Sequence, residues 1–359
     1  MTMPMGKIDP SSSFVQRLLR GRLLYLLCGL LVVVLYAKTG LLRPSGADGG
    51  RTRALEEVPA WWPSELDEAR LKTAIAKAPT MGAALSVLTV VLFGMGGGGV
   101  ALLVWGMSTG RLRGLLRFAS GWKPQWSFGE LARITLLILF AAALLPFLAL
   151  LIAPPPGGAG DHRAWMTVSM LVLDVFAILL ILGFARGKGG SAGPVLGFWG
   201  RGPWPSIATG LRGYLAVFPW LFIVLFAVVE LARVLHLRVP VEPIQELLFQ
   251  ERRPAVLALV VALACVVGPV AEELFFRGVV YSALRRRISR PAAMVLSGTA
   301  FSLAHTNLLG FLPITMLGGL LAYLYERTGS LAGPLAVHIL HNTLLMSLTL
   351  VFRQLLSVS

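Results

Sequence analysis

Six polar residues in the last third of the chain have the types and spacing that acid–base chemistry needs. They are two adjacent glutamates, an arginine, two histidines and an asparagine: Glu272, Glu273, Arg277, His305, His338 and Asn342. Each lies in or at the end of an apolar run, where ionisable side chains are costly and are therefore candidates for function. A carboxylate can activate water as a general base, and histidine and asparagine N–H groups can stabilise an oxyanion.

The spacing of these residues predicts which of them share a helix face. Glu273 and Arg277 are four residues apart, so on a helix they lie on one face and can form an ion pair. Glu272 points about 100° away on the same helix, which directs it toward the interior of a bundle. His338 and Asn342 are also four residues apart and project together. Separate apolar segments therefore offer polar groups to one cavity opposite Glu272.

The composition places these residues in a membrane protein. Of the 359 residues, 56% are hydrophobic and only 14% are charged, whereas soluble domains usually carry about a quarter charged residues. Apolar runs that approach the roughly 20 residues needed to cross a bilayer recur along the chain. They lie at 23–37, 81–106, 131–153, 165–185, 211–235, 254–275, 291–309, 311–325 and 331–352. The sequence thus predicts an all-α, polytopic transmembrane helical bundle of about eight or nine spans.

The net charge of +15 is distributed as membrane orientation requires. Arginine and lysine gather before the first apolar run and after the second, fourth and sixth, which is every other loop. Cytoplasmic loops carry such an excess and lie close to anionic headgroups. We therefore expect a multi-pass protein of the cell inner (plasma) membrane with a cytoplasmic N-terminus. We expect the basic residues to contact the lipid bilayer and not nucleic acid. The sequence lacks the combination of aromatic and basic residues on which a single nucleic-acid strand could stack.

The polar groups divide the chain into two regions. Residues 1–190 are predicted to form an N-terminal transmembrane region with an extracytoplasmic polar loop at 38–80. Residues 191–359 carry almost every intramembrane polar group that could do chemistry. The glycine-rich run at 94–99 in the first region is expected to allow close helix packing.

Three motifs occur in order on successive apolar segments of the second region. They are Glu272-Glu273-x-x-x-Arg277, Phe301-x-x-x-His305 and His338-x-x-x-Asn342, with Tyr325–Ser330 before the third. This set resembles the CPBP family of intramembrane glutamic endopeptidases, the Abi or type II CAAX prenyl protease-like family, over about residues 191–350. Any single motif is weak because four-residue spacings arise by chance, but the ordered set is specific. The resemblance implies that the core bundle of the family lies in the C-terminal half.

The resemblance also implies roles for the site residues. Family members are thought to cleave peptide bonds with a glutamate-activated water and without a metal or another cofactor. By motif position, Glu272 would be the general base, and His305 would help to bind the water. His338 and Asn342 would donate to the oxyanion of the tetrahedral intermediate, while the adjacent ion pair would support the base-bearing helix. The substrate would be a membrane-embedded or membrane-anchored peptide or protein.

The main alternative is a non-catalytic member of the same family, which would be a membrane scaffold, an immunity protein or a regulatory protein. The intact motifs favour catalysis, because a scaffold has no reason to keep all of these polar groups. A secondary transporter is expected to show inverted repeats with broken helices, and none is recognisable in the sequence. The H-E-x-x-H motif of zinc proteases is absent, although Glu272, His305 and His338 could imitate a two-histidine, one-glutamate site.

Other polar residues in the apolar runs have no motif support. Asp174 and Glu230 are isolated carboxylates, and each could pair with another span. His341 lies three residues after His338 and is expected to be structural. Gly158–Asp161 matches the Gly-x-Gly-Asp of presenilin-like proteases, but it lies in a Pro–Gly turn and lacks a second aspartate motif.

Overall fold

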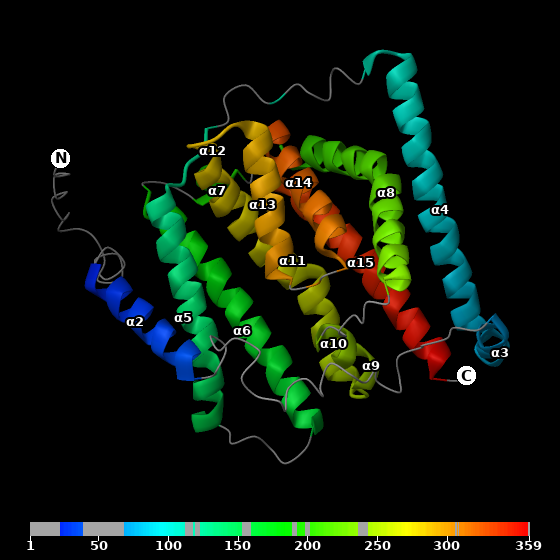
Figure 1. Cartoon of the computed structure of the whole chain (residues 1–359), viewed down its shortest axis with the longest axis horizontal. Coiled ribbons are helices and arrows are strands. Elements are labelled where there is room, and N and C mark those ends of the chain that lie inside the picture. The colour runs from blue at the N-terminus through cyan, green and yellow to red at the C-terminus, as the bar shows by residue number, and fades with distance from the viewer. Residues whose placement is uncertain are drawn as a thin grey trace.

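The computed structural model describes most of the chain. The described residues are 22–38, 68–111, 118, 123–152, 159–188, 192–197, 202–235, 243–305, 307 and 309–357. Over these ranges the regular structure is entirely helical. The helices pack side by side as one bundle (Figure 1).

The structure describes five helices in the N-terminal half. They are α2 (Arg22–Lys38), α3 (Glu68–Lys77), α4 (Pro79–Ser108), α5 (Phe128–Ile152) and α6 (Ala159–Arg186). Helices α2, α5 and α6 pack together on one side of the bundle, whereas α4 packs on α8 and α15 at the opposite side (Figure 1). Helix α3 lies near the end of the predicted polar loop at 38–80. Residues 39–67 of this loop lie outside the described residues.

The C-terminal half begins with α7 (Ala192–Leu196), α8 (Pro203–Val234) and α9 (Pro243–Gln250). A continuous helical span follows, made of α10 (Pro254–Ala262), η3 (Leu263–Val267), α11 (Gly268–Glu272), η4 (Glu273–Tyr281) and α12 (Ser282–Arg285). It is followed by α13 (Arg290–Ala304), α14 (Phe311–Thr328) and α15 (Ala332–Leu356). Helix α14 is central, since it contacts α8, α13, α15 and η4.

Six helical segments are long and apolar enough to cross a membrane. They are Pro79–Ser108, Phe128–Leu145, Arg163–Arg186, Pro203–Val234, Pro254–Arg285 and Ala332–Leu356. Helices α2, α13 and α14 occupy the three other predicted positions, but they are shorter or more polar. Large apolar side chains such as Phe93 and Phe226 are exposed on the long helices, as contact with lipid requires. The prediction of an all-α, multi-pass membrane protein is confirmed.

The span Pro254–Arg285 departs from α-helical geometry at two places, η3 and η4, which are π-helical. Proline has no N–H, so Pro269 cannot satisfy a carbonyl in the preceding turn. The Gly268 N–H donates to Leu263 O, five residues earlier. In the same pattern residue 269 would donate to Ala264 O, but proline has no N–H and this carbonyl lacks a backbone donor. Asn342 Nδ2 of α15 fills this place at 2.8 Å. The π geometry therefore ties this span to α15.

Helices α13 and α14 approach closely because glycines face each other. A Cβ on Gly298 would lie 2.6 Å from a carbonyl oxygen of α14, and one on Gly318 would lie 2.8 Å from the Gly298 Cα. In the predicted glycine-rich run at 94–99, Gly99 packs in the same way on the backbone of α8 at Leu215. Small residues thus set the helix crossings on which the polar site depends.

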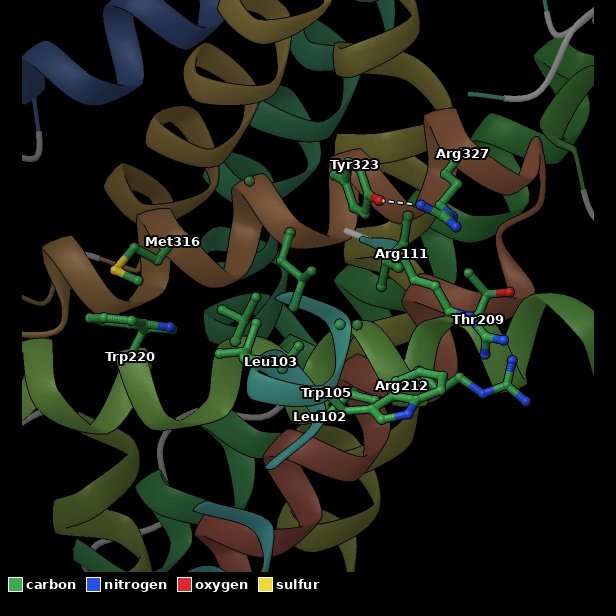
Figure 2. A pocket seen from close by; sticks show the side chains of 17 residues that line it. Leu102, Leu103, Trp105, Arg111, Thr209, Arg212, Trp220, Met316, Tyr323 and Arg327 are labelled. Atoms are coloured by element: carbon green, nitrogen blue, oxygen red, sulfur yellow. Dashed lines mark hydrogen bonds between the residues drawn. The ribbon is translucent and has the colours of Figure 1, made fainter. Parts of the chain in front are cut away.

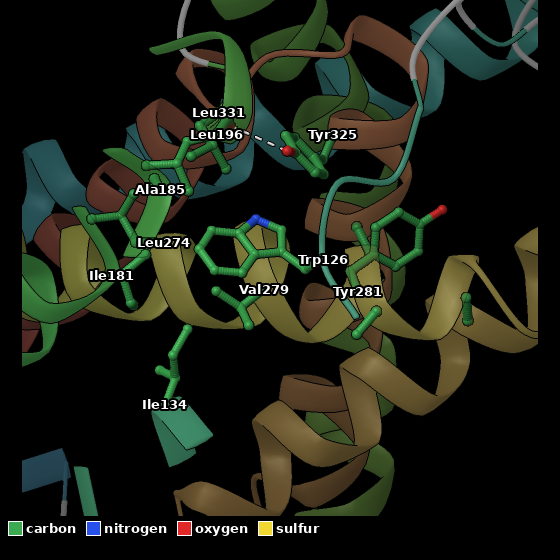
Figure 3. Close-up of a cluster of buried hydrophobic side chains, with 13 residues drawn as sticks. Trp126, Ile134, Ile181, Ala185, Leu196, Leu274, Val279, Tyr281, Tyr325 and Leu331 are labelled. Carbon is green, nitrogen blue, oxygen red and sulfur yellow. Dashed lines mark hydrogen bonds between the residues drawn. The ribbon is translucent and has the colours of Figure 1, made fainter. Parts of the chain in front are cut away.

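The largest buried apolar cluster supports η4 from one side (Figure 3). Trp126, which precedes α5, is fully buried, and it packs with Ile181 of α6, Val279 of η4 and Tyr325 of α14. Burial of side chains of this size contributes roughly 1.5–3 kcal/mol each. Helices from both predicted regions of the chain therefore hold the segment that carries the polar motif.

Candidate active site

Glu273 of η4 is the centre of a buried polar network. Its Oε1 atom lies 2.8 Å from Arg277 Nη1 and 2.8 Å from His338 Nδ1. All three side chains are at most 2% exposed. The predicted pair of Glu273 and Arg277 is present. Residue spacing within one helix could not predict that His338 of α15 also binds Glu273.

The Arg277 side chain fills the space between η4, α13 and α14. Its Nη2 atom donates to Gly318 O at 3.3 Å, and its Cζ atom lies 4.4 Å from the centre of the Phe301 ring. Burial of a charge is costly unless the charge is paired and hydrogen-bonded. The carboxylate of Glu273 pairs the charge, and the carbonyl and the aromatic face add two contacts. Arg277 Nε and Glu273 Oε2 are buried without a hydrogen-bond partner among the described residues.

His338 bridges the two adjacent glutamates. Glu273 is a carboxylate and can only accept, so His338 Nδ1 donates to it. This bond turns Nε2 toward Glu272, whose Oε2 atom lies 3.4 Å away. The Glu272 side chain is 32% exposed, so it is accessible from outside the bundle. A carboxylate that fixes one ring nitrogen sets the tautomer and direction of the other, and Nε2 is thereby placed beside an accessible carboxylate.

His305 and Asn342 lie at the edge of this network. His305 Nδ1 is 2.9 Å from Phe301 O at the end of α13. The centre of the Phe301 ring lies 4.6 Å from the His305 ring and 5.5 Å from the His338 ring. Asn342 uses one of its two N–H donors on Ala264 O. His305 therefore connects to the network through Phe301, and Asn342 retains a second donor.

The carboxylates that the sequence left isolated have different surroundings. Asp174 of α6 lies beside the turn before Glu272, since a Cβ on Gly268 would be 3.6 Å from Asp174 Oδ2, and its charge interacts with that of Glu272. Glu230 is paired with Arg233 of its own helix at 2.8 Å. Asp174 thus adds a third carboxylate near the site, which hydropathy alone does not show.

Two further polar residues, His341 and Glu326, make structural contacts. His341 Nδ1 lies 2.8 Å from Tyr214 OH of α8, in agreement with the role expected for it. At the end of α14, Glu326 accepts from Tyr281 OH at 2.9 Å and pairs with Arg290 at 2.7 Å. Glu326 belongs to the Tyr325–Ser330 segment and ties α14 to the end of η4.

The described residues contain no group of three histidine, cysteine, aspartate or glutamate side chains placed to hold a metal ion. Glu272, His305 and His338 accordingly do not form a two-histidine, one-glutamate ligand set in this structure. Glu273 and Glu272 instead use their oxygens on Arg277 and His338.

Comparison with known proteins identifies the segment that carries the network. Residues 254–344 match the family model described as "Type II CAAX prenyl endopeptidase Rce1-like". Over this segment, the chain is similar to the CAAX protease, or CPBP, family. A Bacillus subtilis (strain 168) protein named "Putative membrane peptidase YdiL" is 30% identical over 92 residues. That alignment covers 26% of this chain and 38% of the relative. No solved structure matches the chain significantly.

All six residues predicted for the site lie within the matched segment 254–344. The helices before residue 254 lie outside it. The family match therefore covers the segment that carries the polar network and none of the earlier helices. Among those helices, α5, α6 and α7 nevertheless pack around η4 and support the network.

Proposed function

We propose that the chain is an intramembrane endopeptidase that hydrolyses a peptide bond of a membrane-embedded or membrane-anchored substrate with a glutamate-activated water. The observation that carries the proposal is the order Arg277–Glu273–His338–Glu272, in which a buried ion pair orients an imidazole against an accessible carboxylate. The family match and the relative named as a membrane peptidase support it.

In the proposed reaction Glu272 is the general base. It takes a proton from water, the hydroxide adds to the carbonyl carbon, and the same proton then passes to the leaving nitrogen as the C–N bond breaks. A proton on His338 Nε2 allows this atom to donate to the oxyanion, and Glu273 stabilises the imidazolium. The second N–H of Asn342 is a further donor, and His305 helps to bind the water. Donors fixed in a site of low dielectric contribute most to such a reaction.

The alternative of a non-catalytic membrane scaffold is less favoured. A buried charge network contributes little net stability, and apolar residues of similar volume often serve a fold as well. A scaffold would therefore gain little from keeping Glu273, Arg277 and His338 buried beside an accessible Glu272.

Glu272→Gln tests the role of the base while it preserves side-chain size. We expect hydrolysis to fall by about 10²- to 10⁴-fold while the amount of protein in the membrane stays unchanged. The measurement is mass spectrometry of membrane peptides in cells that lack the protein and are complemented with each variant. Glu230→Gln, which changes a partly exposed carboxylate of α8, is the matched control. Equal peptide profiles for the wild type and Glu272→Gln would contradict the proposal.

The proposed reaction uses no metal, and chelation tests this point directly. Purified protein is treated exhaustively with a chelator, and zinc content and hydrolysis are measured in parallel. We expect unchanged hydrolysis in the metal-free sample, since a carboxylate base alone can activate the water. Stoichiometric zinc in the untreated protein, with activity lost on chelation and restored by zinc, would instead make Glu272 a metal ligand.

A further inference from the structure

A cavity away from the candidate active site lies between α4, α8 and α14. Its volume is about 750 Å³, within the range of roughly 300–1,000 Å³ that is typical of small-molecule sites. It lies on the side of α14 that carries Met316, Gly319 and Tyr323 (Figure 2). The neighbouring residue Gly318 contacts Arg277 instead. Helix α14 therefore separates this cavity from the candidate active site.

The two ends of the cavity differ in polarity, as Figure 2 shows. Arg111, Arg212 and Arg327 gather at one end, and Trp220 and Met316 lie at the other. Most of the remaining wall is apolar, and none of the described residues that line the cavity is an aspartate or a glutamate. The cavity therefore combines a strongly positive end with a long apolar body.

The positive end is built from side chains held by aromatic neighbours. Arg327 Nη1 donates to Tyr323 OH at 2.6 Å, and Arg111 Cζ lies 4.7 Å from the centre of the Trp105 ring. These contacts position two of the three guanidinium groups at this end of the cavity. Arginine binds phosphate oxygens in pairs, so an anionic group fits this end of the cavity.

The length of the cavity matches one leaflet of a bilayer. Arg212 and Trp220 are eight residues apart on α8, which is about 12 Å along a helix. Met316 and Arg327 are eleven residues apart on α14, or about 16 Å. Half of the roughly 30 Å hydrocarbon core is of similar size. The arginines also lie at the helix ends that the charge distribution assigns to the cytoplasm.

We propose that this cavity binds an anionic membrane phospholipid. The phosphate lies among the guanidinium groups of Arg111, Arg212 and Arg327, and an acyl chain follows the apolar body past Gly319 toward Trp220. Trp105 and Trp220 are 49% and 53% exposed, so the cavity opens sideways and a lipid can enter from the bilayer. Bound in this way, the lipid joins α4 to α8 and α14.

The experiment measures lipid binding to purified, delipidated full-length protein. Phosphatidylglycerol and phosphatidylcholine with identical acyl chains are added separately, and bound lipid is counted by native mass spectrometry while Tm is recorded. A ligand that binds only the folded state raises Tm. We expect phosphatidylglycerol to bind at least about tenfold more tightly and to raise Tm more, because only its headgroup has a net negative charge.

Two variants with matched controls locate the site. Arg111→Gln/Arg212→Gln removes two of the phosphate ligands, and Arg286→Gln/Arg287→Gln removes the same charge from exposed cytoplasmic positions. Gly319→Leu fills the apolar body, whereas Gly183→Leu adds the same side chain to α6. A Cβ at either glycine meets nothing within 4 Å, so both leucine variants should fold.

We expect Arg111→Gln/Arg212→Gln and Gly319→Leu each to weaken phosphatidylglycerol binding by about tenfold, and neither control to change it. Equal losses in the two double arginine variants would overturn the proposal, because they would indicate attraction to charge in general. Equal binding of both lipids would overturn it as well. A dimer that only Gly319→Leu dissociates would assign the cavity to a second copy of this chain instead of a lipid.

Discussion

Arg277 is fully buried, and among the described residues its ion-pair partner is the carboxylate of Glu273 at 2.8 Å. The same carboxylate also accepts from His338 at 2.8 Å. Loss of any one member leaves another with its charge or its hydrogen bond unmet in a region of low dielectric. The network therefore contributes to the site chiefly by holding His338 in one orientation, and less by adding net stability.

Arg277→Met is expected to destabilise the protein by about 3–5 kcal/mol, because the Glu273 charge is left buried without compensation. Glu273→Gln/Arg277→Met removes both charges and should recover part of this loss. The measurement is reversible unfolding in mixed detergent micelles. Arg287→Met, at an exposed position, is the control and should change the unfolding free energy by less than about 0.5 kcal/mol. A double variant less stable than Arg277→Met would contradict this account.

At this scale, the sequence specified only part of the site. A four-residue spacing identifies neighbours on one helix, and it correctly paired Glu273 with Arg277. Contacts between helices depend on where the helices cross, and that position is set by backbone approach at glycines such as Gly298. The bond between His338 and Glu273, and the place of Asp174 near Glu272, were for this reason not predictable from spacing.

At the scale of the element, the long span Pro254–Arg285 shows why predicted boundaries failed at polar motifs. The apolar run was expected to end at 275, because two glutamates and an arginine interrupt it. The helix continues to Arg285, since these polar side chains are satisfied inside the bundle. The segment 291–309 shows the reverse, because α13 ends at Ala304. There the Asn307 side chain accepts from the Gly310 N–H at 2.6 Å and forms a turn.

The π segment around Pro269 makes a testable prediction about Asn342. Asn342→Ala leaves Ala264 O without its donor, which is expected to cost about 1–3 kcal/mol. Pro269→Ala restores an N–H that can serve a carbonyl of the preceding turn, so Asn342→Ala should cost less in that background. Unfolding of the four proteins of this double-mutant cycle in detergent micelles gives the coupling energy, expected to be at least about 0.5 kcal/mol. Additive effects would show that the two residues act independently.

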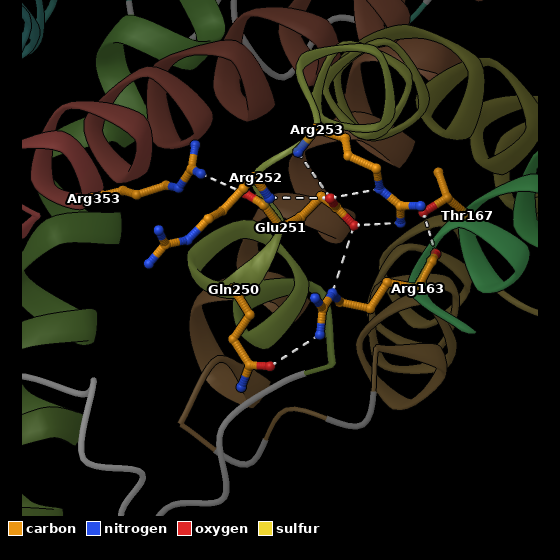
Figure 4. A network of polar contacts seen from close by, with 7 residues as sticks. All are labelled: Arg163, Thr167, Gln250, Glu251, Arg252, Arg253 and Arg353. Atoms are coloured by element: carbon orange, nitrogen blue, oxygen red, sulfur yellow. Dashed lines mark hydrogen bonds and ion pairs between the residues drawn. The ribbon is translucent and has the colours of Figure 1, made fainter. Parts of the chain in front are cut away.

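At the scale of the whole molecule, the charged clusters lie at the helix ends that the positive-inside pattern separates. Glu326 and its arginine partners lie at one end of α14, on the side assigned to the cytoplasm. A cluster around Glu251 lies between α9 and α10, on the side assigned to the exterior (Figure 4). The all-α, multi-pass class of the fold followed from hydropathy alone. Their packing did not, because nearly uniform apolar surfaces do not specify which helix meets which.

Glu251 joins three parts of the fold at this end of the bundle. Its carboxylate accepts from Arg253 Nε at 2.9 Å and Nη2 at 2.8 Å, and it pairs with Arg163 of α6 at 3.5 Å. Its carbonyl accepts from Arg353 of α15. The hydrogen bonds from the Arg253 side chain lower the pKa of Glu251 from 4.5 to about 2, with further lowering by the backbone N–H groups of Arg252 and Arg253. When the carboxylate is ionised, it links α6 to the start of α10. The carbonyl of the same residue links this cluster to α15.

The stability that Glu251 supplies should depend on pH in a defined direction. Because folding lowers its pKa from 4.5 to about 2, the contribution is complete above about pH 5 and is lost as the pH falls toward 2. Glu251→Gln should therefore be less stable than the wild type by roughly 2 kcal/mol at pH 7, and this difference should shrink between pH 4.5 and pH 2. Unfolding in detergent micelles is measured for both proteins at several pH values, so that the titration of all other carboxylates cancels in the difference.

Glu230→Gln changes an exposed pair, so its difference from the wild type should stay below about 1 kcal/mol at every pH. A difference between wild type and Glu251→Gln that stays constant down to pH 3, or grows as the pH falls, would show that the Glu251 cluster does not supply this stability.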